Sequence, residues 1–265
     1  MNPKVSIIMG IYNCESTLKE SIDSIVNQTF QEWEFIMCDD GSTDKTYEIA
    51  KEYEVKYPDK FLVIKNSENM GLAYSLNHCL KYAKGKYIAR QDGDDYSKPN
   101  RLERQVDFLD DNPKLGLVST GIKLFDNENI WDGYMPKSRP ESIDVINCKA
   151  FVHAAAMIRK ELLDKVNGYR VSNETLRNED FDLWCRIYKV GIKGGNILER
   201  LYCVREDISA YKRKKFKYRI DEMRIRKKYF FDLNIDKKKI PIIIKPIIVG
   251  IIPGNLILKI KKYIY

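Results

Sequence analysis

The chain has 265 residues, of which 44% are hydrophobic and 32% charged, a composition that supports a folded core and excludes a mainly disordered protein. No uninterrupted apolar run reaches the roughly 18–20 residues of a membrane-spanning helix, and the N-terminus lacks the pattern of a secretory signal, so we expect a cytoplasmic protein. The formal net charge is +8 and is unevenly placed: residues 211–265 contain 17 Lys or Arg and 4 Asp or Glu, whereas residues 1–210 contain 29 and 34. Six cysteines without a CxxC pair, beside two histidines, argue against a zinc site.

The first half of the chain alternates short apolar runs with stretches of helical periodicity. The apolar runs predict strands at 5–11, 35–38, 61–64 and 87–89, and the periodic stretches predict helices at 16–28, 43–57 and 71–83. This order predicts an α/β fold with a Rossmann-like, mostly parallel central sheet and helices on both faces. In such sheets, ligands bind beyond the carboxyl ends of the strands.

Acidic residues directly follow two of these predicted strands. Asp39 and Asp40 come after the second strand, and Asp92, Asp94 and Asp95 come after the fourth. Turn formation and helix capping explain the later residues of the DDGSTD sequence, but not its first two acids. The three acids after the fourth strand repel one another unless a cation lies among them, and Mg²⁺ and Mn²⁺ prefer oxygen ligands. The pattern therefore indicates a metal-assisted site at this edge of the sheet.

The second half of the chain is less regular. We predict a helix at 99–109, strands at 115–120 and 152–158, and a helix that opens at 179–184 with EDFDLW. Acids at the start of a helix complement its dipole. Glu179 and Asp180 therefore have either that structural role or a functional one.

The basic C-terminal part contains an apolar stretch at 240–258, IPIIIKPIIVGIIPGNLIL. Its three prolines are incompatible with one straight spanning helix. The basic flanks and the terminal Tyr263 and Tyr265 favour a segment that lies in an anionic membrane surface. The alternative is a segment that packs on the domain or on a second subunit.

Six motifs occur in a fixed order along the chain: VSIIMGIYN at 5–13, DDGSTD at 39–44, NMGLAYSLN at 69–77, ARQDGDD at 89–95, HAAAMIRKELLDKVNGYR at 153–170 and EDFDLW at 179–184. Together they make residues 4–212 similar to a family 2 glycosyltransferase with the GT-A fold. The resemblance implies a catalytic domain at 1–210, with a nucleotide-binding half at about 1–98 and an acceptor half at about 99–210. A basic, amphipathic helical extension at 211–265 would then associate with the membrane.

The resemblance implies which residues bind the nucleotide. Those that line or border it are Ile11, Tyr12, Asp40, Asn69 and Gly71. Within this set, the Asp40 carboxylate matches the group that hydrogen-bonds the pyrimidine ring.

The resemblance also gives a role to the acidic turn Asp92-Gly93-Asp94 in the donor site. Asp94 would bind a divalent cation, Mn²⁺ or Mg²⁺, while Asp92 would contact the ribose or a metal-bound water. Arg90 would either offset the charge of this turn or reach the nucleotide.

On the acceptor side, the resemblance matches Asp180 to the catalytic base, with Glu179 as its neighbour. His153 lies near the diphosphate or the acceptor, or is a core histidine, and Trp184 either contacts the acceptor or packs in the core. Arg205 either closes over the diphosphate or begins the basic tail.

The activity implied is transfer of one sugar, with inversion, from a nucleotide sugar, taken here as a UDP-sugar, to a glycan or lipid-linked acceptor. Such enzymes build bacterial capsule, exopolysaccharide or lipopolysaccharide, and the tail would hold this one on the inner face of the cell membrane. The chain lacks the Q-x-x-R-W motif of processive members, which favours single-sugar transfer. The alternatives are a nucleotidyltransferase, or a catalytically degenerate module that binds membrane or nucleic acid through the tail, although we expect no nucleic-acid partner.

Overall fold

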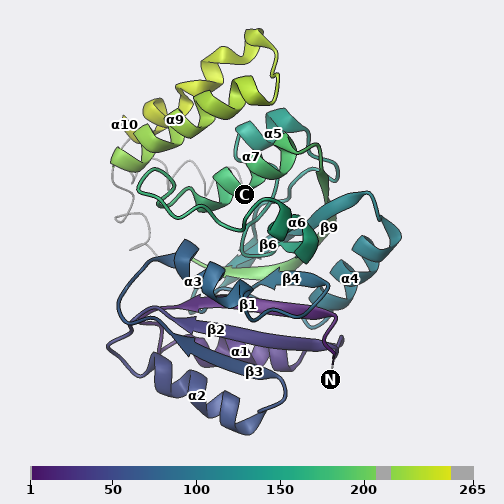
Figure 1. The fold of residues 1–265 in the computed structure, drawn as a ribbon, viewed down its shortest axis with the longest axis vertical. Coiled ribbons are helices and arrows are strands. Elements are labelled where there is room, and N and C mark those ends of the chain that lie inside the picture. The colour runs from purple at the N-terminus through teal and green to yellow at the C-terminus, as the bar shows by residue number, and fades with distance from the viewer. Residues whose placement is uncertain (1, 207–215, 252–265) are drawn as a thin grey trace.

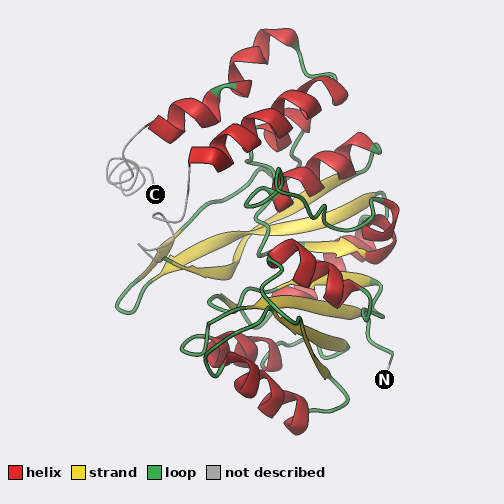
Figure 2. Cartoon of the chain, turned by 60° about the vertical axis from the view of Figure 1, so that its left-hand side comes forward, coloured by secondary structure: helices red, strands yellow, loops and turns green. Residues whose placement is uncertain are grey.

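The structure, a computed structural model, describes residues 2–206 and 216–251 (Figure 1). Within these residues, nine strands form one sheet in the order β3-β2-β1-β4-β8-β6-β9-β5, and β7 pairs with β6. Helices cover both faces of the sheet, and the C-terminal helices lie outside one of these helical layers (Figures 1 and 2).

The N-terminal part of the sheet is parallel, as predicted. β1 (Val5–Ile11) lies between β2 (Trp33–Asp39) and β4 (Tyr87–Arg90), and β3 (Phe61–Lys65) pairs with the far side of β2. Successive side chains of β1 point to opposite faces, so that Ile7 and Met9 enter one core and Ile8 enters the other. Because the strands are parallel, the loops that follow β1, β2 and β4 meet at one edge.

Beyond β4 the sheet becomes mixed. β8 (Met157–Arg159) runs antiparallel to β4 and to β6 (Leu115–Phe125), and β9 (Lys193–Arg205) runs parallel to β6. β5 (Tyr96–Ser97) and β7 (Ile130–Asp132) are short antiparallel additions.

The strand predicted at 152–158 is therefore wrong over most of its length. The backbone first makes a turn, in which Ala155 N donates to Val152 O at 3.2 Å and Ala156 N to His153 O at 3.1 Å. The apolar pattern of this stretch reflects burial of its small alanines in the turn, because burial alone does not require a strand.

Two helical layers flank the sheet. One contains α1 (Leu18–Val26), α2 (Thr46–Lys56) and α4 (Arg101–Asp111). The other contains α3 (Leu72–Leu80), α5 (Ser142–Ile146), α6 (Lys160–Lys165) and α7 (Glu179–Lys189). The helices predicted for the first half of the chain are all present, with ends that differ by up to three residues.

The described part of the C-terminal extension consists of α9 (Phe216–Asp232), the 3₁₀-helix η1 (Lys237–Ile243) and α10 (Lys245–Ile251). Ile225, Tyr229, Phe230 and Ile243 are buried in the same core as α5 and α7, so residues 216–251 pack on the domain. No helix in the described ranges is long and apolar enough to cross a membrane. The rest of the basic tail, including the interfacial Tyr263 and Tyr265, lies outside the described residues.

Candidate active site

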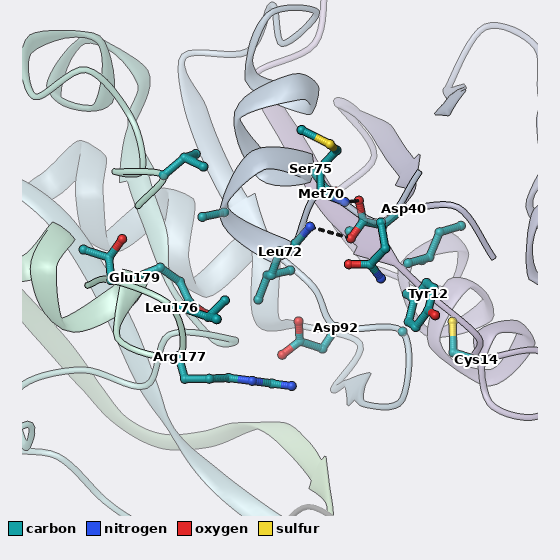
Figure 3. A pocket seen from close by; sticks show the side chains of 18 of the residues that line it. Tyr12, Cys14, Asp40, Met70, Leu72, Ser75, Asp92, Leu176, Arg177 and Glu179 are labelled. Carbon is teal, nitrogen blue, oxygen red and sulfur yellow. Dashed lines mark hydrogen bonds between the residues drawn. The ribbon is translucent and has the colours of Figure 1, made fainter. Parts of the chain in front are cut away.

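A cavity of about 390 Å³ opens at the edge where β1, β2 and β4 end (Figure 3). Most of the predicted site residues line it: Ile11, Tyr12, Asp40, Asn69, Gly71, Asp92, Gly93, Asp94 and Glu179. The predicted residues that are not on its wall are Arg90, His153, Asp180, Trp184 and Arg205. The structure thus brings the three acidic groups of the sequence, after β2, after β4 and at the start of α7, to one cavity.

At one end of the cavity, Asp40 is buried, with 4% of its surface exposed, and its carboxylate accepts three hydrogen bonds. Oδ1 accepts from Asn66 Nδ2 at 2.8 Å and from Met70 N at 2.9 Å, and Oδ2 accepts from Gly71 N at 2.8 Å. The carboxylate therefore holds the loop that starts α3, a role that the sequence did not suggest. Since a carboxylate oxygen accepts two hydrogen bonds, Oδ2 keeps one acceptor position.

The loops after β1 and β2 are tied to each other beside this end. Asn13 adopts a left-handed φ of 47°, and its Oδ1 accepts from Thr43 N at 2.9 Å while its own N donates to Ser42 Oγ at 3.1 Å. Tyr12 precedes this turn, with 48% of its surface exposed and its ring on the cavity wall. Gly71, at φ 87°, makes the turn into α3, a conformation that glycine adopts readily.

In the middle of the cavity, Asp92 belongs to a chain of polar contacts that runs into the core. Its carboxylate pairs with Arg90 Nη2, and Arg90 Nη1 donates to Nδ1 of His153 at 2.8 Å. Burial, and then the charge of Arg90, lowers the pKa of His153 well below its ordinary value. The imidazole is therefore neutral, and its Nε2–H donates to the Tyr169 hydroxyl at 2.9 Å.

Arg90 and His153 both lie behind the cavity wall. Arg90, with 4% of its surface exposed, pairs with Asp92 and is not on the cavity wall. Trp184 is likewise buried at 4% exposure, with its ring centroid 5.4 Å from that of Phe151 and 5.8 Å from that of His153, which is a core position.

The remaining residues of the acidic turn are held from outside the cavity by Arg205. Its backbone N donates to Asp95 Oδ1 at 2.9 Å, and its Nε donates to Asp94 O at 3.1 Å. Burial, and then the charges of Asp92 and Asp94, raises the pKa of Asp95 well above its ordinary value. Asp95 thus supports the turn, and Asp92 and Asp94 are the acids of the turn that line the cavity.

Two cavity carboxylates fit a hard divalent cation that takes its other ligands from phosphate and water. Over residues 2–206 and 216–251, no three or more His, Cys, Asp or Glu side chains are grouped so that they could hold a metal ion. A cation at Asp92 and Asp94 would therefore depend on oxygen ligands from the substrate.

At the other end of the cavity, α7 begins with the acidic pair. Glu179 lines the cavity, whereas Asp180 lies off the wall and its Oδ1 accepts from Phe181 N at 2.7 Å. Burial, and then the charge of Asp180, raises the pKa of Glu179, and burial raises the pKa of Asp180. Both carboxyl groups are thus easier to protonate than usual, as suits a proton acceptor.

The segment between α6 and α7 forms the wall opposite Tyr12, and sequence reasoning missed it. Its cavity-lining residues are Arg170, Val171, Ser172, Thr175, Leu176 and Arg177. The segment has no helical or alternating period. The sequence feature that could have indicated a role in the site is its position directly before the acidic pair.

Comparison with known proteins identifies a family and several relatives that this chain resembles. Residues 6–166 match the sequence model of the family described as Glycosyl transferase family 2. EpsE of Bacillus subtilis (strain 168) is 49% identical over 219 residues, which are 83% of this chain and 79% of EpsE. The UDP-Glc:alpha-D-GlcNAc-diphosphoundecaprenol beta-1,3-glucosyltransferase WfaP of Escherichia coli is 31% identical over 192 residues, covering 72% of this chain and 73% of WfaP.

Solved structures share the fold. TarS 1–349 of S. aureus, in complex with UDP, superposes with a TM-score of 0.72 at 20% identity, over 92% of this chain and 70% of that one. The mannosyltransferase PcManGT of Pyrobaculum calidifontis, in complex with GDP-Man and Mn²⁺, gives a TM-score of 0.64 at 22% identity, over 94% and 69%. These likenesses confirm the predicted GT-A fold.

Proposed function

This chain belongs to the family 2 glycosyltransferases, and from that premise we propose that it transfers one sugar from a nucleotide sugar to a glycan or lipid-linked acceptor in bacterial surface polysaccharide synthesis. The observation that carries the proposal is the single cavity onto which Asp40, the Asp92 and Asp94 carboxylates and Glu179 converge. Family membership favours sugar transfer over nucleotidyl transfer and over a binding module.

The donor is a UDP-sugar in this proposal. Asp40 Oδ2 has one acceptor position left for the ring N–H of uracil, and the half-exposed Tyr12 ring lies on the same end of the cavity. The names of similar proteins support a nucleotide sugar: WfaP is named for UDP-Glc, and TarS was solved with UDP.

Asp92 and Asp94 would hold Mn²⁺ or Mg²⁺ against the diphosphate. A bound divalent cation supplies Lewis-acid stabilisation of the charge that develops on a leaving diphosphate. Arg90 keeps the Asp92 carboxylate in place by pairing with it, and Arg205 holds the backbone of the turn.

The acidic pair that opens α7 would accept the proton of the acceptor hydroxyl. The family resemblance matches Asp180 to this base, and the geometry adds Glu179, since that carboxylate reaches the cavity wall. General-base assistance is worth roughly 10²–10⁴-fold in rate. Separate Glu179→Gln and Asp180→Asn variants assign the role to the one that loses this factor in kcat while still binding donor.

The acceptor is lipid-linked in this proposal, and the protein is peripheral on the inner face of the cell membrane. Ile244, directly before α10, and Ile248 and Ile251 of α10 recur at helical spacing. They are 51%, 55% and 72% exposed, so they form an outward apolar stripe. The exposed Lys237, Lys238 and Lys239 of η1 precede it. An apolar stripe beside basic residues suits an anionic bilayer surface.

The decisive experiment is a donor screen. Wild type and Asp94→Ala are incubated with a panel of nucleotide sugars with and without Mn²⁺, and thermal stability and nucleoside diphosphate release are recorded. We expect one nucleotide sugar to stabilise the wild type in a metal-dependent way and Asp94→Ala to lose that response. If no nucleotide sugar binds the wild type, the proposed activity is refuted.

Membrane association needs a separate test with point variants, because deleting the extension would expose the core that α9 covers. Ile244→Ser combined with Ile248→Ser should weaken sedimentation with anionic vesicles and leave the melting temperature unchanged. Wild-type sedimentation of this double variant would refute attachment through α10.

A further inference from the structure

The wall of the cavity between α6 and α7 is built as a fixed turn. Thr175 and Asn178 are buried, with 1% and 6% of their surfaces exposed. Thr175 Oγ1 donates to Arg170 O at 2.7 Å, and Asn178 N donates to Thr175 O at 2.8 Å. Asn178 Nδ2 also donates to Tyr218 O of α9 at 3.3 Å, which joins the turn to the extension.

Arg177 lies between these two anchors in a conformation that an arginine seldom adopts. Its φ is 67°, in the left-handed region that is unfavourable for residues with a Cβ atom. Such residues persist where the surrounding structure fixes them, and they cluster at ligand sites. Here the fixed backbone directs the side chain into the cavity.

The guanidinium of Arg177 is available to a ligand. The side chain extends from the wall toward Asp92 (Figure 3) and lines the cavity. Within the described ranges, no hydrogen bond or ion pair engages it. Arg170, the other cavity arginine, is already paired, since its Nη2 lies 3.0 Å from Asp182 Oδ1 and its Nη1 lies 3.5 Å from Glu174 Oε2.

The position of Arg177 along the cavity indicates what it would bind. The uracil end is marked by Asp40 and the transfer end by Glu179, and Arg177 points toward Asp92, between these two ends. A diphosphate placed there brings negative charge close to the cavity carboxylates. A guanidinium offers a planar fork of donors that matches phosphate oxygens.

We propose that Arg177 binds the diphosphate of the nucleotide sugar and stabilises the leaving nucleoside diphosphate, an inference that rests on the proposed function. In the transfer, the acceptor oxygen forms a bond to the anomeric carbon as the bond from that carbon to the diphosphate oxygen breaks. The electron pair of the broken bond stays on the diphosphate, where Arg177 donates to it. The hydroxyl proton passes to the acidic pair at the start of α7.

The test compares UDP with uridine, which lacks the phosphates. Binding of each to wild type, Arg177→Gln, Arg177→Lys and Arg177→Asn is measured by isothermal titration calorimetry. Hydrogen bonds to charged groups predict roughly 10- to 100-fold weaker UDP binding for Arg177→Gln, with uridine binding unchanged. Arg177→Lys should recover part of the loss. Arg177→Asn should resemble Arg177→Gln, because asparagine tolerates the left-handed backbone, so its effect reports loss of the guanidinium and not backbone strain.

Arg104→Gln serves as the matched charge control, since Arg104 lies on the surface of α4 paired with Glu199. It should bind UDP as the wild type does. Equal UDP affinity of Arg177→Gln and wild type would overturn the inference alone, as would an equal loss of UDP and uridine binding. A wild type that binds no UDP, GDP or nucleotide sugar would instead remove the proposed function as well.

Discussion

Replacing Asp40 by asparagine should destabilise the protein even without a ligand. The substitution keeps the size of the side chain but turns one carboxylate oxygen into an NH₂ group that faces a donor. Of the three hydrogen bonds from Asn66, Met70 and Gly71, at least one is lost, and a buried N–H is left opposite another N–H. Hydrogen bonds to charged groups contribute about 1.5–3 kcal/mol each.

From these values we expect the free energy of unfolding of Asp40→Asn to fall by about 3 kcal/mol. For a domain of this size, about 2–4 °C of Tm accompanies each kcal/mol, so the melting temperature should fall by about 6–12 °C. Thermal and urea unfolding of the ligand-free protein, followed by circular dichroism, measure both quantities. Donor binding should also weaken, because the Met70–Gly71 backbone lines the cavity.

Asp44→Asn is the matched control. Asp44 also accepts from backbone amides, Thr46 N at 3.0 Å and Glu15 N at 3.2 Å, but it is only half-buried and lies off the cavity. Asp44→Asn should cost less than about 1 kcal/mol, because asparagine serves about as well as aspartate where a side chain accepts from backbone amides at the start of a helix. If Asp40→Asn melts no lower than Asp44→Asn, the carboxylate does not hold the loop as described.

Three further results are expected. Glu179→Gln should raise the melting temperature at pH 7. Burial and the charge of Asp180 raise the pKa of Glu179 and outweigh the weaker opposite effects of Arg90 and Arg177, so its ionised form costs stability above the unfolded pKa of about 4.5. The gain should vanish in melts below that pH, and a pH-independent gain would contradict this explanation. Tyr229→Phe should cost about 1 kcal/mol in urea unfolding, because the Tyr229 hydroxyl lies 3.2 Å from the buried Asp182 Oδ1, and unchanged stability would show that the hydroxyl contributes nothing. Gly85→Ala should lower stability by about 1–3 kcal/mol, since a Cβ atom there would lie 2.5 Å from the backbone N of Ser6; a wild-type melting curve would mean that β1 and the turn before β4 separate easily.

The N-terminal half of the fold, in which strands, helices and turns alternate regularly, was predicted well from the sequence. The apolar runs of β1 and β2 and the acids behind them are local signals, and parallel pairing then brings Asp40 and Asp92 to one edge. By contrast, β9 contains Gly194, Gly195 and Asn196, which break an apolar pattern, and it is a strand because β6 pairs with it over a long register.

The candidate site divides in the same way. Acids that directly follow a predicted strand can be recognised in the sequence. The three donors to Asp40 come from residues 66–71, and no sequence spacing predicts that this loop contacts Asp40. The direction of the Arg177 side chain depends on the left-handed φ of this residue. A sequence does not predict that φ for an arginine. Asp92 and Arg90 are two residues apart in the sequence, so their contact is local. Arg90 and His153 are 63 residues apart, and their contact needs the folded sheet.

The packing of α9 on α7 has a geometric consequence for acceptor choice. Tyr218 and Tyr229 of α9 contact Asn178 and Asp182, on either side of Glu179, so the stripe on α10 and the mouth of the cavity belong to one solid body. If α10 rests on a membrane surface, as proposed, the reaction centre stands at a fixed height and angle above that surface. The enzyme would then select acceptors by the distance of their reactive hydroxyl from that surface. Acceptors that hold the hydroxyl closer to the surface or farther from it would not reach the reaction centre.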